Sequence, residues 1–421
     1  MKQLFLGISL LLAVDCLTAQ EADQKIGDLI NKNDWFTLEE IFVKEKNNIQ
    51  SLTLSLLAET LLSLSFNQQE RASQLLDSLL MYYQHDLSFE NISNLVLMKG
   101  KIIGDSGYYS QSADYINHFL KTVPIFSNHI ALAEMYGELR NEQKPEIVRP
   151  DKDTEIPLTI KEAGKGRLMF VPVTINGKTR SFIFDTGASS TFISERFARE
   201  AGVRIVRDSI PITGVEVCTG KTGTIDSLMV GDIIFKNPMI FVSDNTPDID
   251  SIYQIDAILG LDFIKRVGEV QIFPDQGKIL FPKSRTPLPK TGRNLLIENN
   301  QPYLKAFSGD ERLMFHFDTG DADGELYQPY FLKHQEEVEG KGTKEEVRRG
   351  GFCGYRNISG YRIPSISLKI GNTAFDWPDI FVATESAHSV QQDEDGALGM
   401  IFISKFKKIT INFEDMFVEA E

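Results

Sequence analysis

The sequence predicts a multidomain chain of α and β type, with α-helical hairpin repeats at the N-terminus and a bilobal, all-β part after them. Apolar residues recur at helical spacing, almost without proline, over residues 20–141. Short β-rich runs follow the proline- and charge-rich stretch 142–155, which we expect to be a linker. One phrase of the β-rich part occurs twice, as FIFDTGASS at 182–190 and FHFDTGDAD at 315–323.

The composition limits the classes of function that the chain can have. Its 421 residues allow two or three domains, and 42% hydrophobic residues are typical of a globular protein. A formal net charge of −15 excludes a nucleic-acid partner, because such a partner requires clustered Lys and Arg. The six histidines show no metal-ligand spacing, and neither do the cysteines, so we expect no metal and no cofactor.

Residues 1–19 are typical of a secretory signal peptide. Lys2 precedes the apolar run 4–14, and small residues lead to an expected cleavage site after Ala19. The run is too short to span a bilayer, and no later stretch is long and apolar enough to do so. Cys16 offers a lipoprotein signal as the alternative, but Asp15 stands where that signal needs a small neutral residue. We therefore expect an exported protein, periplasmic or secreted, without a transmembrane segment.

The helical part, residues 20–141, contains three phrases in which a turn leads into a helix. They begin at Asn33, Asn67 and Asp105, with 34 residues between the first two and a longer interval after them. A 34-residue period resembles that of tetratricopeptide helix pairs, and a generic helical bundle is the alternative. Such a domain could recruit a protein partner or a protein substrate.

The β-rich part repeats itself in three blocks that keep their order. Asp185 and Asp318 lie 133 positions apart, SLMVGDIIFKNPMIFV from Ser227 matches SLKIGNTAFDWPDIFV from Ser367, and AILGLDFIKRVGEVQIF from Ala257 matches GALGMIFISKFKKITIN further on. Chance similarity between β-rich sequences would not preserve this order. We infer a tandem duplication, with one lobe over 156–283, a linker at 284–290 and a second lobe over 291–421.

The repeated unit resembles the retropepsin-like and pepsin-like aspartic peptidases, on the apolar-apolar-Asp-Thr-Gly phrase and a distal apolar-Leu-Gly. The resemblance covers the β-rich part and none of the helical part. It implies the bilobal acid-protease fold, in which each lobe brings one D-T-G loop to a central cleft. It also implies that Leu259–Gly260 and Leu398–Gly399 buttress these loops. Two units in one chain imply the pepsin-like arrangement, so we expect a monomer.

The resemblance assigns catalysis to Asp185 and Asp318. Two carboxylates about 3 Å apart cannot both ionise, so they share one proton. The ionised partner takes a proton from water, and the protonated partner donates to the carbonyl oxygen of a peptide bond. A single D-T-G loop cannot do this, which explains why the phrase occurs twice. The expected substrate is a protein or a peptide.

The other residues of the two loops are expected to support the carboxyls. The glycines allow close approach of the opposite lobe, and the resemblance implies that the threonines hydrogen-bond across the pseudo-twofold axis. Ala188 replaces a hydroxyl of the pepsin-like enzymes, which predicts a working pH less acidic than that of pepsin. The supporting set is Thr186, Gly187, Ala188, Ser189, Thr319 and Gly320.

The second loop departs from the family pattern at two places. Asp321 stands where the first loop has Ala188, and it could either raise the shared pKa further or point into solvent. His316 replaces the apolar Ile183, and we expect it to support the strand rather than to catalyse. These departures leave open a lobe that has kept its fold and lost its chemistry.

The resemblance implies a flap hairpin after each D-T-G strand, and the glycine-rich segments 212–223 and 348–357 are expected to form these two flaps. Each contains one of the two cysteines that remain after cleavage of the signal. Cys218 and Cys353 could form a disulfide between the flap tips, but we favour two cysteines packed separately under their hairpins. The candidates for contact with substrate are Gly214, Cys218, Gly220, Cys353, Gly354 and Tyr355.

The combined prediction is an exported bacterial aspartic endopeptidase with an N-terminal tetratricopeptide-like region. Two alternatives remain open. The first is a catalytically inactive protein that binds peptides on the same fold. The second is an enzyme in which only the first lobe is catalytic and which acts as a homodimer.

Overall fold

The computed structural model describes residues 21–123, 127–163, 166–215, 217–243, 257–385 and 394–421. The expected signal peptide, residues 1–19, therefore lies outside the described residues. The chain divides between Lys144 and Pro145 into a helical unit and a β-rich unit, which we describe separately. Among the described residues, no helix combines the length and the hydropathy that crossing a membrane requires.

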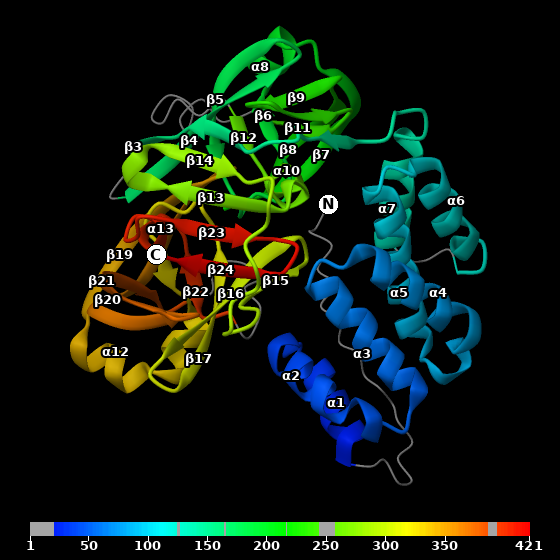
Figure 1. Cartoon of the computed structure of the whole chain (residues 1–421), viewed down its shortest axis with the longest axis horizontal. Coiled ribbons are helices and arrows are strands. Elements are labelled where there is room, and N and C mark those ends of the chain that lie inside the picture. The colour runs from blue at the N-terminus through cyan, green and yellow to red at the C-terminus, as the bar shows by residue number, and fades with distance from the viewer. Residues whose placement is uncertain (1–20, 124–126, 164–165, 216, 244–256, 386–393) are drawn as a thin grey trace. The chain divides into compact units, whose positions relative to one another are not determined.

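The helical unit is a succession of antiparallel helices that bury apolar faces (Figure 1). Side-chain oxygens cap several helix starts: the Leu54 amide donates to Ser51 Oγ, and the Asn91 amide donates to Ser88 Oγ. Leu76 and Leu79 are fully buried, in agreement with the helical spacing of the sequence. The helices are α1 (Glu21–Asn31), α2 (Trp35–Glu45), α3 (Leu52–Ser65), α4 (Gln69–Tyr82), α5 (Phe89–Asp105), α6 (Tyr109–Leu120) and α7 (Ser127–Glu138).

The first half of the β-rich unit is built on one sheet, with strand order β1-β10-β9-β4-β5-β12-β6-β11-β8-β7 and β3 beside β4. Two short helices, α8 (Glu195–Glu200) and α10 (Leu261–Ile264), accompany it. The strands are β1 (Glu146–Val148), β3 (Thr159–Ala163), β4 (Gly166–Ile175), β5 (Lys178–Phe184), β6 (Phe192–Ser194), β7 (Arg204–Thr213), β8 (Val217–Thr224), β9 (Ser227–Val230), β10 (Ile233–Lys236), β11 (Met239–Ser243) and β12 (Ala257–Leu259).

The second half has its own sheet, with strand order β15-β16-β17-β22-β18-β21-β20-β19. Short helices α11 (Gln328–Lys333), α12 (Gln335–Lys341) and α13 (Met400–Ile403) belong to this half. The strands are β15 (Leu295–Glu298), β16 (Gln301–Ser308), β17 (Glu311–Phe317), β18 (Glu325–Leu326), β19 (Thr343–Gly351), β20 (Gly354–Ile370), β21 (Thr373–Ala383) and β22 (Gly396–Leu398).

A third sheet, with strand order β2-β14-β13-β23-β24, joins the two halves. Val270 of the first half pairs with Ile411 of the second, and both are fully buried. Fixed in this way, the two halves hold their D-T-G loops in one relative position. The strands are β2 (Thr154–Pro157), β13 (Glu269–Phe273), β14 (Lys278–Phe281), β23 (Ile409–Asn412) and β24 (Phe417–Ala420).

The stretch 142–155, expected to be a linker, belongs to the β-rich unit from Pro145 onward. Here β1 pairs with β10, and β2, which begins at Thr154, pairs with β14. The two prolines and the charges that suggested a linker lie around edge strands, where proline is tolerated. Residues 284–290, the second expected linker, contain no helix or strand.

Candidate active site

Each D-T-G loop starts where one strand ends beside a parallel partner. In the first half, β5 runs parallel to β12, and the Asp185 amide donates to the Leu259 carbonyl at 3.1 Å. In the second half, β17 runs parallel to β22, and the Asp318 amide donates to the Leu398 carbonyl at 3.1 Å. The same backbone bond therefore fixes each aspartate to the leucine of the distal Leu-Gly pair in its own half.

The threonines of the two loops are joined by reciprocal hydrogen bonds. Thr186 Oγ1 donates to the Phe317 carbonyl at 2.6 Å and accepts from the Thr319 amide at 3.0 Å. Thr319 Oγ1 donates to the Phe184 carbonyl at 2.7 Å and accepts from the Thr186 amide at 3.0 Å. Both threonines are fully buried, so these four bonds are shielded from water. They fix the loops of the two halves to each other.

The glycines of the loops contact the opposite carboxyl. A Cβ at Gly187 would lie 2.3 Å from Cγ of Asp318, and a Cβ at Gly320 would lie 2.4 Å from Cγ of Asp185. No side chain fits at either position. Each carboxyl therefore lies against the backbone of the other loop, and both belong to one site.

The two carboxyls interact directly. Burial raises the pKa of Asp185 well above its ordinary value, and so do the charge of Asp318 and a hydrogen bond between the two side chains. The amides of Ala188 and Gly187 act in the opposite direction, and the Ala188 amide donates to Asp185 Oδ1 at 2.9 Å. On the other side, the Gly320 amide donates to Asp318 Oδ1 at 2.8 Å. This arrangement favours one shared proton over two ionised carboxylates.

Asp321 contributes a third carboxyl to the neighbourhood of the pair. Its Oδ1 accepts from the amides of Asp323 and Gly324 at 3.1 Å and 2.9 Å. Burial, followed by the charge of Asp318, raises the pKa of Asp321 to about 6. Of the two alternatives from the sequence, the structure favours a carboxyl that acts on the pair over one that points into solvent.

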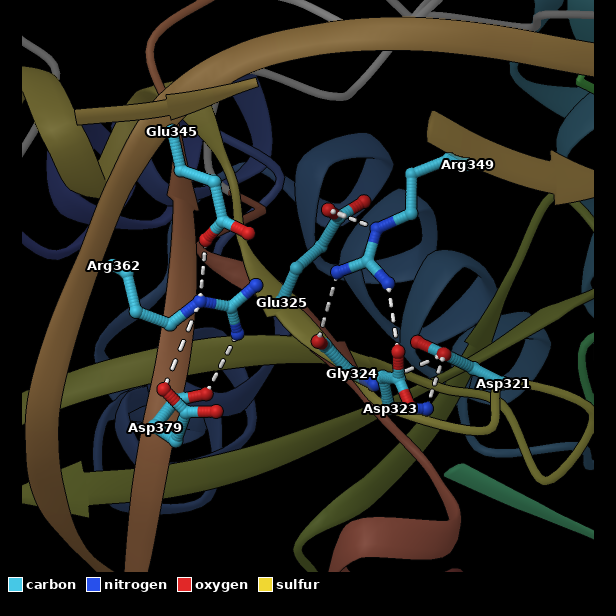
Figure 2. A network of polar contacts seen from close by, with 8 residues as sticks. All are labelled: Asp321, Asp323, Gly324, Glu325, Glu345, Arg349, Arg362 and Asp379. Atoms are coloured by element: carbon cyan, nitrogen blue, oxygen red, sulfur yellow. Dashed lines mark hydrogen bonds and ion pairs between the residues drawn. The ribbon is translucent and has the colours of Figure 1, made fainter. Parts of the chain in front are cut away.

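Arg349, on β19, binds the loop that follows Asp318 (Figure 2). Its guanidinium pairs with Asp323 at 3.1 Å and with Glu325 at 3.0 Å, and it donates to the Gly324 carbonyl at 3.4 Å. Burial raises the pKa of Glu325, and the charge of Arg349 opposes that shift. In the same view, Arg362 pairs with Glu345 and Asp379. Arg349 therefore holds a hairpin strand against the loop that follows Asp318.

The distal glycines pack against the D-T-G loops. A Cβ at Gly260 would lie 2.3 Å from the backbone of Ser190, and one at Gly399 would lie 2.0 Å from the Asp318 carbonyl oxygen. The Leu261 amide donates to the Ala188 carbonyl at 2.7 Å, and the Met400 amide makes the equivalent bond to the Asp321 carbonyl at 3.0 Å. The buttressing expected of the two Leu-Gly pairs therefore consists of backbone hydrogen bonds and of close approaches that only glycine permits at 260 and 399.

Two further residues of the site region were singled out from the sequence, Ser189 and His316. Ser189 is half-buried in the first loop. His316 is on β17, and its Nε2 lies 2.8 Å from Gln301 Oε1 on the neighbouring strand. This contact is consistent with the supporting part expected for His316.

Both segments expected to be flaps are hairpins in the structure. β7 and β8 form the first, and β19 and β20 form the second. A Cβ at Gly214 would lie 2.0 Å from the Phe352 carbonyl oxygen, so the two turns meet. Tyr355 lies opposite Gly350, and the Arg348 guanidinium is 4.2 Å from the centre of the Tyr355 ring.

Cys218 and Cys353 form a disulfide that joins the two hairpins, with their Cα atoms 5.5 Å apart. The arrangement favoured from the sequence, two separately packed cysteines, is therefore wrong. The sequence places one cysteine in each expected hairpin but does not show how close the two hairpins come to each other. Gly220 and Gly354 lie on the strands of the two hairpins, next to the cysteines.

Sequence reasoning did not single out Arg349, Glu325 or Phe352. The sequence did contain a signal for Arg349. Alternate residues of a strand share a face, so Arg349 lies on the same face as the apolar Val347. Its pairing with Asp323 was not available, since it depends on how β19 lies over a loop 26 residues away. In the described part of the chain, no cluster of His, Cys, Asp and Glu could hold a metal ion.

Comparison with known proteins gives one family and several structures. Residues 171–263 match the family model described as Aspartyl protease. No curated protein matches the chain in sequence. A retropepsin-like aspartic protease from Rickettsia conorii is 18% identical with a TM-score of 0.22, and the match covers 33% of this chain and 94% of that one.

Two plant globulins match a longer part of the chain. Conglutin gamma, a basic 7S globulin from lupine seeds, is 10% identical with a TM-score of 0.39, covering 63% of this chain and 94% of that one. Basic 7S globulin from soybean is 11% identical with a TM-score of 0.40, covering 64% and 94%. The segment around Asp185 thus has the sequence pattern of the aspartyl protease family.

Proposed function

We propose that the protein is an aspartic endopeptidase that hydrolyses peptide bonds through Asp185 and Asp318 of the same chain. The observation that supports this most strongly is the reciprocal contact in which each loop glycine lies against the carboxyl of the other loop. Four threonine hydrogen bonds hold that contact in place. Two tandem lobes of a duplicated unit would each supply half of the pair, as in pepsin-like enzymes.

In the proposed mechanism, one proton is shared between the two carboxyls. The ionised carboxylate removes a proton from a water molecule, and that water attacks the carbonyl carbon of the peptide bond. The protonated carboxyl donates to the carbonyl oxygen, and a proton then passes to the leaving amine. The raised pKa of Asp185 supports this, since it favours one retained proton on the pair over two ionised carboxylates.

A peptide-binding protein without catalysis is the second candidate, and the additional carboxyl of Asp321 favours it. In such a protein we expect Asp318 to be paired with a Lys or an Arg. Arg349, which is bound to the loop that follows Asp318, pairs with Asp323 and Glu325. The pairing of Arg349 with these two carboxylates therefore supports the enzyme over the binding protein.

We further propose that the protein is exported through residues 1–19 and that the helical unit, with its tetratricopeptide-like hairpins, recruits a protein partner or substrate. Fractionation of cells that express the full chain, with sequencing of the mature N-terminus, tests the first part. Affinity capture with residues 20–144 tests the second.

The proposed activity is tested by cleavage of a diverse peptide library between pH 3 and pH 8, with mass spectrometric detection. We expect cleavage at mildly acidic pH that a statine-containing peptide blocks and that Asp185→Asn abolishes. A folded protein that cleaves nothing at any pH, yet binds the statine peptide, would support the binding protein instead.

A further inference from the structure

The turn of the second hairpin contacts the first half of the β-rich unit at three points. Cys353 is bonded to Cys218. The Val215 amide donates to the Phe352 carbonyl at 2.8 Å. The Phe352 ring packs on Phe192 with ring centres 4.8 Å apart. The hairpin of one half therefore ends on the other half.

These contacts lie on the Asp185 side of the site. Phe192 is on β6, and it pairs with Ile258, which also pairs with Ile183 on β5. Two strand spacings of about 4.8 Å place Phe192 roughly 10 Å across the sheet from β5, which ends beside Asp185. The turn thus reaches the sheet that positions the first carboxyl.

On the Asp318 side, Arg349 holds β19, the first strand of the same hairpin. Its ion pairs with Asp323 and Glu325 hold β19 to the loop that follows the second carboxyl. Arg349 is two residues before the end of β19 at Gly351, and residues 352 and 353 form the turn of the hairpin. This segment therefore links the loop that follows Asp318 to the sheet that positions Asp185. We name residues 349–353 the strap.

The disulfide closes this arrangement into a covalent ring. The chain from Cys218 to Cys353 passes through both halves, and the bond joins its two ends. A peptide that lies between the carboxyls and the hairpins passes through that ring. A chain with a free end can be threaded through, whereas a loop closed at both ends can enter only if the hairpins separate.

We propose that the site accepts only a polypeptide with a free end, threaded beneath the strap, and that it excludes cyclic peptides. Loops of folded proteins, whose two ends are held, are excluded for the same reason. This inference rests on the proposed function, because it assumes that the substrate lies between the carboxyl pair and the hairpins. It goes further by naming the topology of the substrate.

The test compares one cleaved sequence as a linear peptide and as a head-to-tail cycle closed by a flexible glycine-serine linker. The ratio of kcat/KM, linear over cyclic, is measured for the oxidised protein and for Cys218→Ser/Cys353→Ser. The opened variant reports the intrinsic disadvantage of the cycle. We expect the ratio to be at least about 100-fold larger for the oxidised protein than for the opened variant.

A second route to the open state protects the test from a variant that does not fold. The wild-type protein is reduced with a dithiol, and its free thiols are counted by mass spectrometry. Reduction should lower the linear-over-cyclic ratio as the double variant does. An unchanged ratio after either treatment would overturn the inference while leaving the proposed function intact.

Failure of the proposed function is recognised separately. If no form of the protein cleaves the linear peptide, binding of fluorescent linear and cyclic statine peptides is measured by anisotropy. A linear preference that is lost on reduction would still support threading. Equal binding of the two peptides, or no binding of either, would overturn it.

Discussion

Asp321→Asn should make the protein more stable at neutral pH, although it removes a charge from a polar loop. The folded chain holds the pKa of Asp321 at about 6, against an ordinary value of 3.8. Because the pKa is raised in the folded state, ionisation of Asp321 weakens folding as the pH rises from about 4 to about 6. Above that window the loss is complete, and below it the loss is absent.

The size of the effect follows from the two pKa values. At about 1.4 kcal/mol for each pH unit between them, full ionisation would destabilise the fold by about 3 kcal/mol. The side chain is only half-buried, so solvent screens part of this, and we expect about 1–2 kcal/mol at pH 7.5. An asparagine keeps the carbonyl oxygen that accepts from the amides of Asp323 and Gly324.

The assay is urea unfolding of wild type and variant at pH 7.5 and at pH 4. We expect the midpoint of the variant to be higher at pH 7.5 and close to that of wild type at pH 4. Asp323→Asn is the matched control, since its carboxylate pairs with Arg349, and it should be destabilising at pH 7.5. A gain for Asp321→Asn of equal size at both pH values would refute the electrostatic reasoning.

The same substitution has a kinetic consequence. Without the negative charge of Asp321, the carboxyl pair gives up its shared proton at lower pH. The alkaline limb of the pH–kcat/KM profile should therefore move down by about 0.5–1 pH unit. An unmoved limb would mean that Asp321 does not act on the pair.

Three further outcomes concern stability. Thr186→Val removes a buried hydroxyl that both donates and accepts between the halves, and it should lower the free energy of unfolding by about 2–4 kcal/mol, with Thr186→Ser close to wild type. Arg349→Met leaves the largely buried Glu325 without its main partner and should cost about 2–3 kcal/mol at pH 7.5 but less at pH 4.5, where Glu325 gains a proton. Arg348→Met, on the exposed neighbour, should change stability by about 0.5 kcal/mol or less at either pH, which thermal unfolding checks. Loss of the disulfide between the hairpins should cost about 2–5 kcal/mol in urea unfolding, and a smaller effect would mean that the hairpins are already restrained without it.

The repeated phrase is sufficient to locate both carboxyls, because each half needs the same strand, turn and distal Leu-Gly pair. The structure brings Asp185 and Asp318 together and joins their threonines. Periodicity also separates the helical part from the β-rich part correctly. The sequence is sufficient for these features because helical periodicity depends on neighbouring residues, and the D-T-G phrase is recognised from its repetition within the chain.

Features that depend on how distant segments lean toward each other could not be predicted. The pairing of Arg349 with Asp323 and the bond between Cys218 and Cys353 both follow from the tilt of two hairpins. Residues 142–155 resemble a linker in sequence because edge strands and linkers share prolines and charges.

The central claim is that one chain supplies both carboxyls of one site. The most direct measurement is kcat/KM for a cleaved peptide with Asp185→Asn, with Asp318→Asn, and with an equimolar mixture of the two. We expect each variant to lose at least about 100-fold, and the mixture to remain as inactive as its components. Activity retained by Asp318→Asn, or recovered on mixing, would contradict the claim and favour a homodimer built from one lobe of each chain.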